Sequence, residues 1–356
     1  MAIYHLTANV ISRARGQSVV AAAAYRMGAA LRDERYGVTH NYVGKRRVVH
    51  AQIMAPVGAP AWALDRQSLW NRVEAREGRK DSQLARLIEV GLPIELSAVE
   101  RVALVREYAA QEFVAKGMIA DFCVRGDAAN PHAHIMLTLR AVTPDGFGPK
   151  ERLWNGKSAL LEWRAAWAER TNDHLARAGH AERIDHRTLA AQQIELTPGR
   201  RIGSRGARRS GSPLPAHLAE RIVDQQRIAR ENGEMILEDP SVALRALTQQ
   251  RPTFTRRQLE QYLKSRTESA PQCDAVLTAV TRCGDLVAVG VVDGEERFTS
   301  RDMIDAEKSL LRRTASMMVR RGHGVARDRQ NVVSTELSLS DAARRAFEYL
   351  DRKSVV

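Results

Sequence analysis

The chain has 356 residues, which is long enough for two domains or for one large domain with an appendage. Since 44% of the residues are hydrophobic, it can bury a sizeable core and is not a disordered tail. Its 55 Lys and Arg against 42 Asp and Glu leave a formal charge of +13, which favours a nucleic-acid partner. The sequence has no apolar run of transmembrane length and no secretory start, so we expect a cytoplasmic protein without membrane insertion. The three scattered cysteines indicate neither a disulfide framework nor a zinc module.

The first elements predicted are a strand at 3–12 and an alanine-rich helix that carries Tyr25 and Arg26. A tyrosine in such a helix is usually a packing residue, and it needs other support to be assigned as a nucleophile. Short strands follow at 37–43 and 47–55, on either side of a basic group formed by Lys45, Arg46 and Arg47.

A helix is predicted at 62–77 from its tryptophan spacing, and a mostly apolar strand at 84–93. Glu89 lies in the middle of that strand, where its carboxylate either faces solvent or has a function. Ser97 and Glu100 have the spacing of a capping box, which predicts a helix that runs to Lys116.

The stretch from Asn130 to Thr138 alternates so that His132 and His134 project from one face of a strand. Two imidazoles at this spacing can hold one cation if a third group joins them, or they can be an ordinary polar strand face. The preceding strand, 118–125, is predicted to form a hairpin with this one. A symmetric hairpin sets Cys123 beside His134, Arg125 beside His132, and Asp121 near Met136, where Asp121 orients an imidazole or faces water.

A helix at about 157–178 completes an α+β domain, predicted to be an antiparallel sheet with helices mainly on one face and to span residues 1–197. Residues 198–240 are predicted to be a basic linker and a helix, and 241–325 a small module of helices and a hairpin with a winged-helix shape. Residues 326–356 form a tail.

Three motifs together resemble the MobA/MobL-type plasmid relaxases, which are members of the HUH endonuclease superfamily. They are AAAAYR with Tyr25, RLIEVGLPIEL with Glu89, and NPHAHIMLTLR with the histidine pair. The resemblance also includes WNRVEAREGRKDSQLAR and WRAAWAERTNDHLARAGH, and it covers about the first 190 residues. It implies an HUH-type sheet and an enzyme that nicks one DNA strand at an origin of transfer, remains joined to its 5′ end, and can reseal it.

Within this resemblance Tyr25 matches the nucleophile, His132 and His134 match two metal ligands, and Glu89 matches a third ligand used in some branches. Many relatives carry another histidine in the strand before the NPH turn, but MIADFCVRGD has none, so Asp121 and Cys123 stand behind Glu89 as alternatives. The implied metal is Mn²⁺ or Mg²⁺, and on ligand softness Ni²⁺ or Zn²⁺ could take its place in preparations. The predicted DNA contacts are all basic: Arg26, Lys45, Arg46, Arg47, Arg125, Arg200 and Arg201.

The resemblance also implies single-stranded DNA, relaxosome accessory proteins and a type IV coupling protein as partners, and passage into the recipient with the DNA. Residues 241–325 resemble the segment that precedes a helicase in longer relatives, and the tail resembles the start of that helicase. The sequence has no GxxxxGK[ST] motif, so we expect a truncated product without ATPase activity. The alternatives are a rolling-circle replication initiator and a degenerate, DNA-binding or autoregulatory protein.

Overall fold

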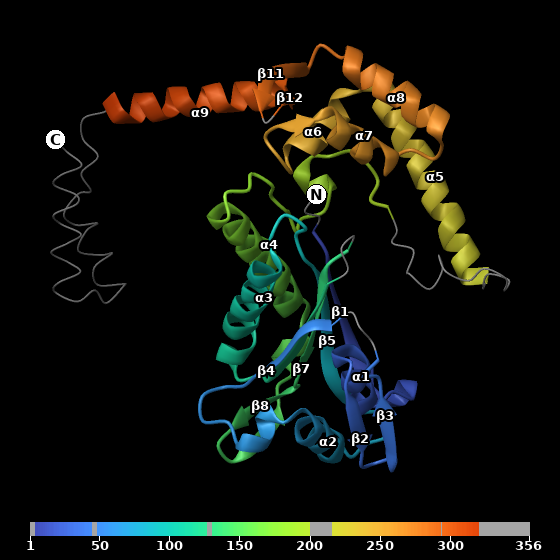
Figure 1. Ribbon diagram of the computed structural model, residues 1–356, viewed down its shortest axis with the longest axis vertical. Coiled ribbons are helices and arrows are strands. Elements are labelled where there is room, and N and C mark those ends of the chain that lie inside the picture. Colours follow the sequence, from blue (N-terminus) through green and yellow to red (C-terminus); the bar gives the residue numbers. More distant parts are fainter. Residues whose placement is uncertain (1–3, 45–47, 127–129, 200–215, 293, 320–356) are drawn as a thin grey trace. The chain divides into compact units, whose positions relative to one another are not determined.

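The computed structural model describes residues 4–44, 48–126, 130–199, 216–292 and 294–319. Strands with alternating apolar residues form a five-stranded antiparallel sheet in the order β1-β5-β7-β6-β4 (Figure 1). The strands are β1 (Leu6–Ser12), β4 (Val48–Met54), β5 (Gln83–Gly91), β6 (Ala120–Arg125) and β7 (His132–Leu137). The predicted α+β class and antiparallel sheet are confirmed.

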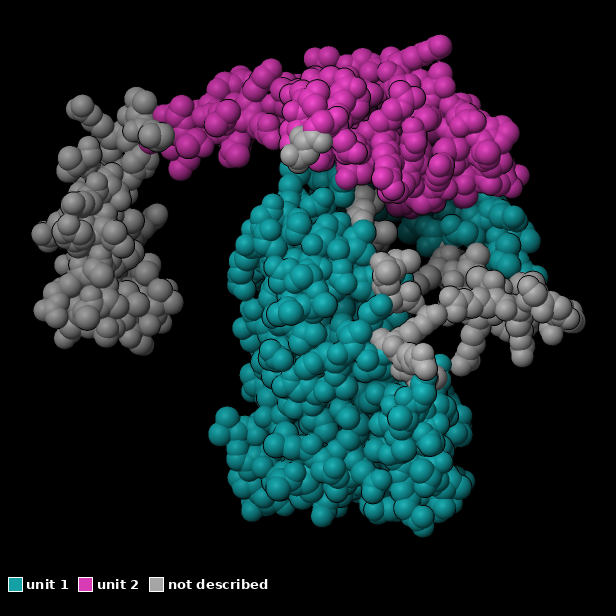
Figure 2. All heavy atoms as spheres, in the orientation of Figure 1, with its two compact units in different colours: residues 1–228, 249–252 teal, residues 229–248, 253–356 magenta. Residues whose placement is uncertain are grey.

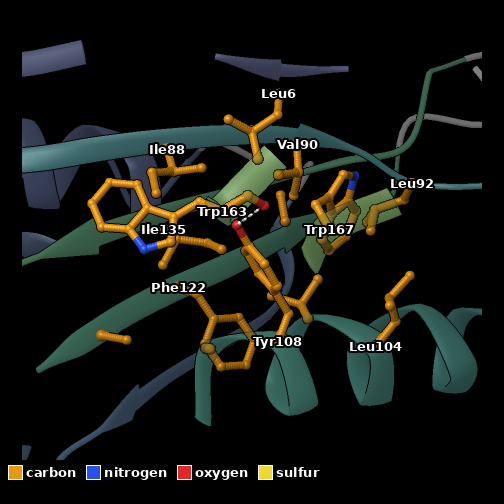
Figure 3. Close-up of a cluster of buried hydrophobic side chains, with 14 of the residues drawn as sticks. Leu6, Ile88, Val90, Leu92, Leu104, Tyr108, Phe122, Ile135, Trp163 and Trp167 are labelled. Carbon is orange, nitrogen blue, oxygen red and sulfur yellow. Dashed lines mark hydrogen bonds between the residues drawn. The ribbon is translucent and has the colours of Figure 1, made fainter. Parts of the chain in front are cut away.

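Helices α3 (Ala98–Glu112) and α4 (Lys157–Arg177) cover one face of this sheet. The Ser97/Glu100 capping box begins α3 as the sequence predicts. Tyr108 of α3 donates its hydroxyl to the carbonyl oxygen of Trp163 on α4 at 2.9 Å inside this core (Figure 3). A buried phenol with a partner adds apolar contact without an unsatisfied polar group.

Helices α1 (Val19–Met27) and α2 (Arg66–Arg76) pack on the opposite face, around a second apolar cluster. Figure 1 shows these two pairs of helices on opposite sides of the sheet, so the layer arrangement differs from the prediction of helices mainly on one face. The alanine-rich sequence of α1 allows this helix to pack on the second face of the sheet, because small side chains let a helix lie close to the strands. Ala23 and Ala24 are fully buried there.

Two small hairpins accompany the sheet. Only the second strand of the first hairpin was predicted from the sequence. They are formed by β2 (Ala30–Asp33) with β3 (Val38–Asn41), and by β8 (Arg140–Thr143) with β9 (Gly146–Lys150). Short 3-10 helices occur at Arg13–Arg15, Ala61–Leu64, Val114–Lys116, Leu153–Asn155 and Ala190–Gln192.

The chain divides into two compact units, shown in different colours in Figure 2. Unit 1 contains residues 1–228 and 249–252, and unit 2 contains 229–248 and 253–356. The division falls inside helix α5 (Ala216–Glu238). The tail at 326–356 lies outside the described residues.

Unit 2 combines helices with a small antiparallel sheet, and its winged-helix shape stays a prediction. The order is α6 (Ser241–Thr248), β10 (Phe254–Thr255), α7 (Arg256–Lys264), α8 (Ala270–Arg282), β11 (Leu286–Val292), β12 (Glu295–Ser300) and α9 (Arg301–Val319). The three strands are antiparallel in the order β10-β12-β11. Helix α8 was not predicted from the sequence.

Candidate active site

Strand register places the predicted metal ligands on one face of the sheet. Glu89 of β5 pairs with His134 of β7, and His134 pairs on its other side with Cys123 of β6. His132, two residues earlier on the same face, pairs with Arg125. The predicted hairpin register is therefore confirmed, and the nonlocal strand β5 brings Glu89 beside the histidines.

His132 has one ring nitrogen fixed by the turn before its strand. Its Nδ1 lies 2.8 Å from the carbonyl oxygen of Asn130. Because a carbonyl oxygen only accepts, Nδ1 must carry the proton and donate. In a neutral ring with this tautomer Nε2 keeps its lone pair, which is the form of imidazole that binds a metal.

The His134 imidazole lies deeper, and its side chain is 14% exposed. Burial is the main cause that lowers the pKa of His134 from 6.5 to about 3, so the ring is neutral at pH 7. Its Nδ1 is buried, has no hydrogen-bond partner, and lies 3.9 Å from Oε2 of Glu89. A buried ring nitrogen without a hydrogen-bond partner, 3.9 Å from a carboxylate oxygen, fits a cation between the two groups.

The Glu89 carboxylate lies between two imidazoles. Its Oε1 is 3.8 Å from Nε2 of His5, on the side away from His134. Interaction with His5 is the largest cause that lowers the pKa of Glu89, to about 2, with smaller contributions from the charges of His134 and His132 and with burial in opposition. Glu89 is therefore ionised at neutral pH. His5 was not predicted to be a site residue.

Tyr25 lies in the last turn of α1, with 39% of its surface exposed and its ring edge-on to Tyr42 at 5.3 Å. The end of that helix is held over the site face by β6. Arg125 Nη2 donates to the main-chain carbonyl of Tyr25 at 3.4 Å and to that of Arg26 at 3.2 Å. Since Arg125 is the strand partner of His132, these bonds bring the Tyr25 turn next to the histidine pair.

The beginning of α1 is held by a separate group of polar contacts. The Ser18 hydroxyl caps the helix by accepting from the amide of Ala21. The buried carboxylate of Glu74 on α2 accepts from the amide of Val19 at 2.9 Å and from Arg13 at 2.6 Å. Both ends of the helix that carries Tyr25 are thus fixed to neighbouring elements.

Arg26 provides a cation beside these groups. Its Nη1 donates to the carbonyl of Ala22 one turn earlier in α1, at 3.1 Å. Burial lowers the pKa of Arg26, while the charges of Cys123, Tyr25 and Glu89 raise it. An arginine remains protonated in such surroundings, so Arg26 supplies positive charge close to Tyr25.

Two residues considered as alternative ligands have other partners. The carboxylate of Asp121 is completely buried and accepts two hydrogen bonds from Nε and one from Nη2 of Arg66, as well as one from the indole of Trp70 at 2.9 Å. The Sγ of Cys123 lies 3.2 Å from the carbonyl oxygen of Arg26, and burial raises its pKa to about 11. These contacts connect β6 to α2 and α1, respectively.

Among the described residues, no group of three or more His, Cys, Asp or Glu side chains is arranged to hold a metal ion as it stands. The neutral imidazole of His134 with its unpartnered Nδ1, the His132 imidazole beside it and the ionised carboxylate of Glu89 nevertheless have the donor chemistry of a divalent-metal site. Of the predicted DNA contacts, Arg26 and Arg125 lie at this face. The others lie outside the described residues: Lys45, Arg46, Arg47, Arg200 and Arg201.

Comparison with known proteins gives consistent matches. Residues 17–210, more than half of the chain, match the MobA/MobL family. The chain is 36% identical over 283 residues to the mobilization protein MobL of Acidithiobacillus ferridurans, and the match covers 68% of this chain and 74% of that protein. A solved structure described as "Molecular Basis of Vancomycin Resistance Transfer in Staphylococcus aureus" is 33% identical with a TM-score of 0.50 and covers 52% of this chain and all of that one.

A longer relative, the conjugal transfer protein TraA of Rhizobium radiobacter, is 30% identical over 393 residues. The match covers 98% of this chain but only 36% of that protein, so the chain spans about a third of its length. The family expected from the three sequence motifs is confirmed: the chain belongs to the MobA/MobL family.

Proposed function

We propose that this chain is a plasmid mobilisation relaxase, a metal-dependent endonuclease that cuts one DNA strand at an origin of transfer and remains joined to the 5′ end through Tyr25. The observation that carries the proposal is the strand register, which sets His132, His134 and Glu89 on the face where Arg125 holds the end of α1. The mobilization and conjugal transfer proteins among its relatives support the same process.

Glu89, His132 and His134 are the residues that would hold the metal ion, with Mn²⁺ or Mg²⁺ as the expected ion and two imidazoles favouring Mn²⁺. Donor atoms that share one ion lie about 3 Å apart, given bond lengths near 2.1 Å. Glu89 Oε2 and His134 Nδ1 are 3.9 Å apart, so small side-chain rotations would bring them into range. When bound, the ion would neutralise and orient the scissile phosphate as a Lewis acid.

Tyr25 is the proposed nucleophile. Its phenolic oxygen bonds to phosphorus while the bond from phosphorus to the 3′ oxygen breaks, which leaves a free 3′-OH and a phosphotyrosine. Tyr25 releases one proton and the 3′ oxygen takes one up, so the step consumes no water. The guanidinium of Arg26 favours the ionised phenol and the anionic phosphate. Because one phosphodiester replaces another, the 3′-OH can attack in reverse and reseal the strand.

DNA binding in this proposal depends mainly on charge. The chain carries a formal charge of +13 and only 5% aromatic residues, which favours phosphate contacts over base stacking and predicts strong salt dependence.

No helix in the described part of the chain is long and apolar enough to cross a membrane. Relaxosome proteins and a coupling protein are proposed partners. Because cutting exchanges one phosphodiester for another, the proposed cycle of cutting and rejoining uses no ATP.

The test is formation of a covalent adduct that survives denaturation. The protein would be incubated with Mn²⁺ and single-stranded oligonucleotides tiled across the replicon that encodes it. We expect an adduct with one oligonucleotide and its loss in Tyr25→Phe. The matched control is Tyr36→Phe, at an exposed tyrosine outside the site, which should react like the wild type. An undiminished adduct in Tyr25→Phe would exclude Tyr25 as the nucleophile.

Two other functions predict different results in the same assay. A rolling-circle initiator would form the adduct with a replication origin and have no effect on mobilisation. A degenerate DNA-binding protein would bind the oligonucleotide and form no adduct with any metal. The mobilization proteins among the relatives favour the relaxase over both.

A further inference from the structure

A third histidine reaches the proposed site from the edge strand of the sheet. His5 lies directly before β1, and its Nε2 is 3.8 Å from Oε1 of Glu89. His134 approaches the other oxygen, Oε2, at 3.9 Å. The two oxygens of one carboxylate therefore face two different imidazoles.

The backbone fixes His5 in this position. Leu6 pairs with Val90, and both are buried in the core on the α3 and α4 face. Alternation along the strand therefore turns His5 toward the opposite face, where Glu89 lies. The carbonyl oxygen of His5 also accepts from the amide of Gly91 at 3.0 Å, which extends the β1–β5 ladder by one residue.

Gly91 contributes no side chain to this face. It pairs with His132 on one side, and its amide bonds to His5 on the other. Because glycine has no side chain, β5 places nothing between the His5 and His132 imidazoles in that row. The next side chain of β5 on this face is Glu89, which thus lies close to histidines from both neighbouring strands.

We propose that His5 is a positioning residue that holds the Glu89 carboxylate in the orientation needed to bind metal together with His132 and His134. This inference rests on the proposed function, because Glu89 is a ligand only if the site binds a metal. A glutamate side chain has several rotatable bonds, and about 29% of that of Glu89 is exposed. A contact on Oε1 leaves Oε2 directed toward His134 and restricts the rotations that would carry it into solvent.

The test is Mn²⁺ affinity, measured by calorimetry on metal-free protein without DNA. Removal of a group that orients a metal ligand costs roughly 10- to 100-fold in affinity, and we expect a loss in this range for His5→Ala. His5→Gln retains a hydrogen-bond donor and should recover part of it. The matched control is His50→Ala, because His50 lies on strand β4 of the same sheet and contacts Gln52 and Phe122 instead of the site.

A double-mutant cycle separates positioning from a direct or merely structural role. If His5 acts through Glu89, the substitution His5→Ala should strongly reduce Mn²⁺ affinity when Glu89 is present. The same substitution should reduce it by less than about twofold when it is added to the Glu89→Gln variant. Equal losses in the two backgrounds would overturn the proposal, and so would a His5→Ala affinity within about twofold of the wild type. The visible spectrum of bound Co²⁺ provides a second readout, and it should change in His5→Ala but not in His50→Ala.

The outcome for the wild type distinguishes this inference from the proposed function. Failure of the wild-type protein to bind Mn²⁺ would remove the metal site itself, and the role of His5 with it. Wild-type binding that persists unchanged in His5→Ala would overturn only the positioning role. If His5→Ala does not fold, the comparison of His5→Gln with the wild type and with Glu89→Gln decides the same question.

Discussion

Arg125 and Arg26 are joined by a hydrogen bond from a strand side chain to a helix carbonyl, with Nη2 of Arg125 3.2 Å from the main-chain oxygen of Arg26. The bond connects the turn that carries Tyr25 to the strand partner of His132. A guanidinium at this point also meets the negative end of the helix dipole, which favours the contact. The position of the proposed nucleophile therefore depends on a residue that belongs to the sheet.

We predict that Arg125→Ala slows adduct formation by about 10- to 100-fold in single-turnover assays, because misplacement of a nucleophile by about 1 Å has effects of that size. Arg125→Lys keeps one donor and should recover part of the rate. Arg106→Ala is the control, since Arg106 donates to Gln52 at an exposed position. A loss of DNA affinity that accounts for the whole loss of rate would indicate a DNA contact instead of a positioning role.

The Arg13–Glu74 pair should contribute to the stability of the fold as well as to the placement of α1. Their side chains are only 7% and 2% exposed, and Glu74 also accepts from the amide of Val19. Removal of one partner leaves the other charge buried, so Glu74→Ala should lower the free energy of unfolding by about 3–5 kcal/mol in urea denaturation. Asp81→Ala breaks an exposed pair with Arg79 and should cost less than about 1 kcal/mol. Similar losses in the two variants would contradict this assignment.

Asp121→Asn should separate structural from metal-binding carboxylates. The contacts with Arg66 and Trp70 predict a loss of about 2–3 kcal/mol in the free energy of unfolding, because hydrogen bonds to a charged group are replaced by weaker ones. Mn²⁺ affinity, measured by calorimetry, should remain within about threefold of the wild type. A tenfold loss of affinity in a folded variant would restore Asp121 as a group acting on the metal site.

Cys123 should be a poorly reactive thiol. Burial raises its pKa to about 11, so only about a thousandth of it is thiolate at pH 8, by the definition of a pKa. We expect slow alkylation of Cys123 in the folded protein and faster alkylation of the half-buried Cys283, as measured by mass spectrometry of peptides. Rapid labelling of Cys123 under native conditions would show that the contact between β6 and α1 opens easily.

The same shift predicts a change of stability at alkaline pH. The folded pKa of Cys123, about 11, lies above its ordinary value of 9.0, so the fold favours the neutral thiol. The associated stabilisation is fully present below about pH 9, where the thiol is neutral in both states, and it is lost as pH rises from about 9 to 11, by about 2–3 kcal/mol in total. Cys123→Ala should lack this component when the two proteins are unfolded in urea across that range.

The local parts of the site could be predicted from the sequence. The hairpin of β6 and β7 has a period of two on both strands and a short connection, which was enough to pair Cys123 with His134 and Arg125 with His132. The capping box of α3 was equally local. The contact of Glu89 with His134 is different, because β5 joins β7 across the sheet, and only resemblance to a family connected them in advance.

His5 and Asp121 show why the remaining contacts could not be predicted. The contact between His5 and Glu89 depends on which strand lies beside β5, and alternation within one strand does not contain that information. The one local signal for a site role of His5 was its position on the strand face opposite the buried Leu6. Asp121 shares the face of the histidines and was expected to orient an imidazole or to face water, but Arg66 and Trp70 on α2 bind it. Helix packing, which sequence periodicity leaves undetermined, decided its role.

The anchoring of α1 at both ends has a consequence for the second half of the proposed cycle. Glu74 holds the first turn of this helix and Arg125 holds the last. A DNA strand linked to Tyr25 would thus be attached to a rigid part of the domain, not to a mobile arm. Its esterified phosphate would stay close to the three proposed metal ligands while the rest of the strand moved away, in position for attack by an incoming 3′ end.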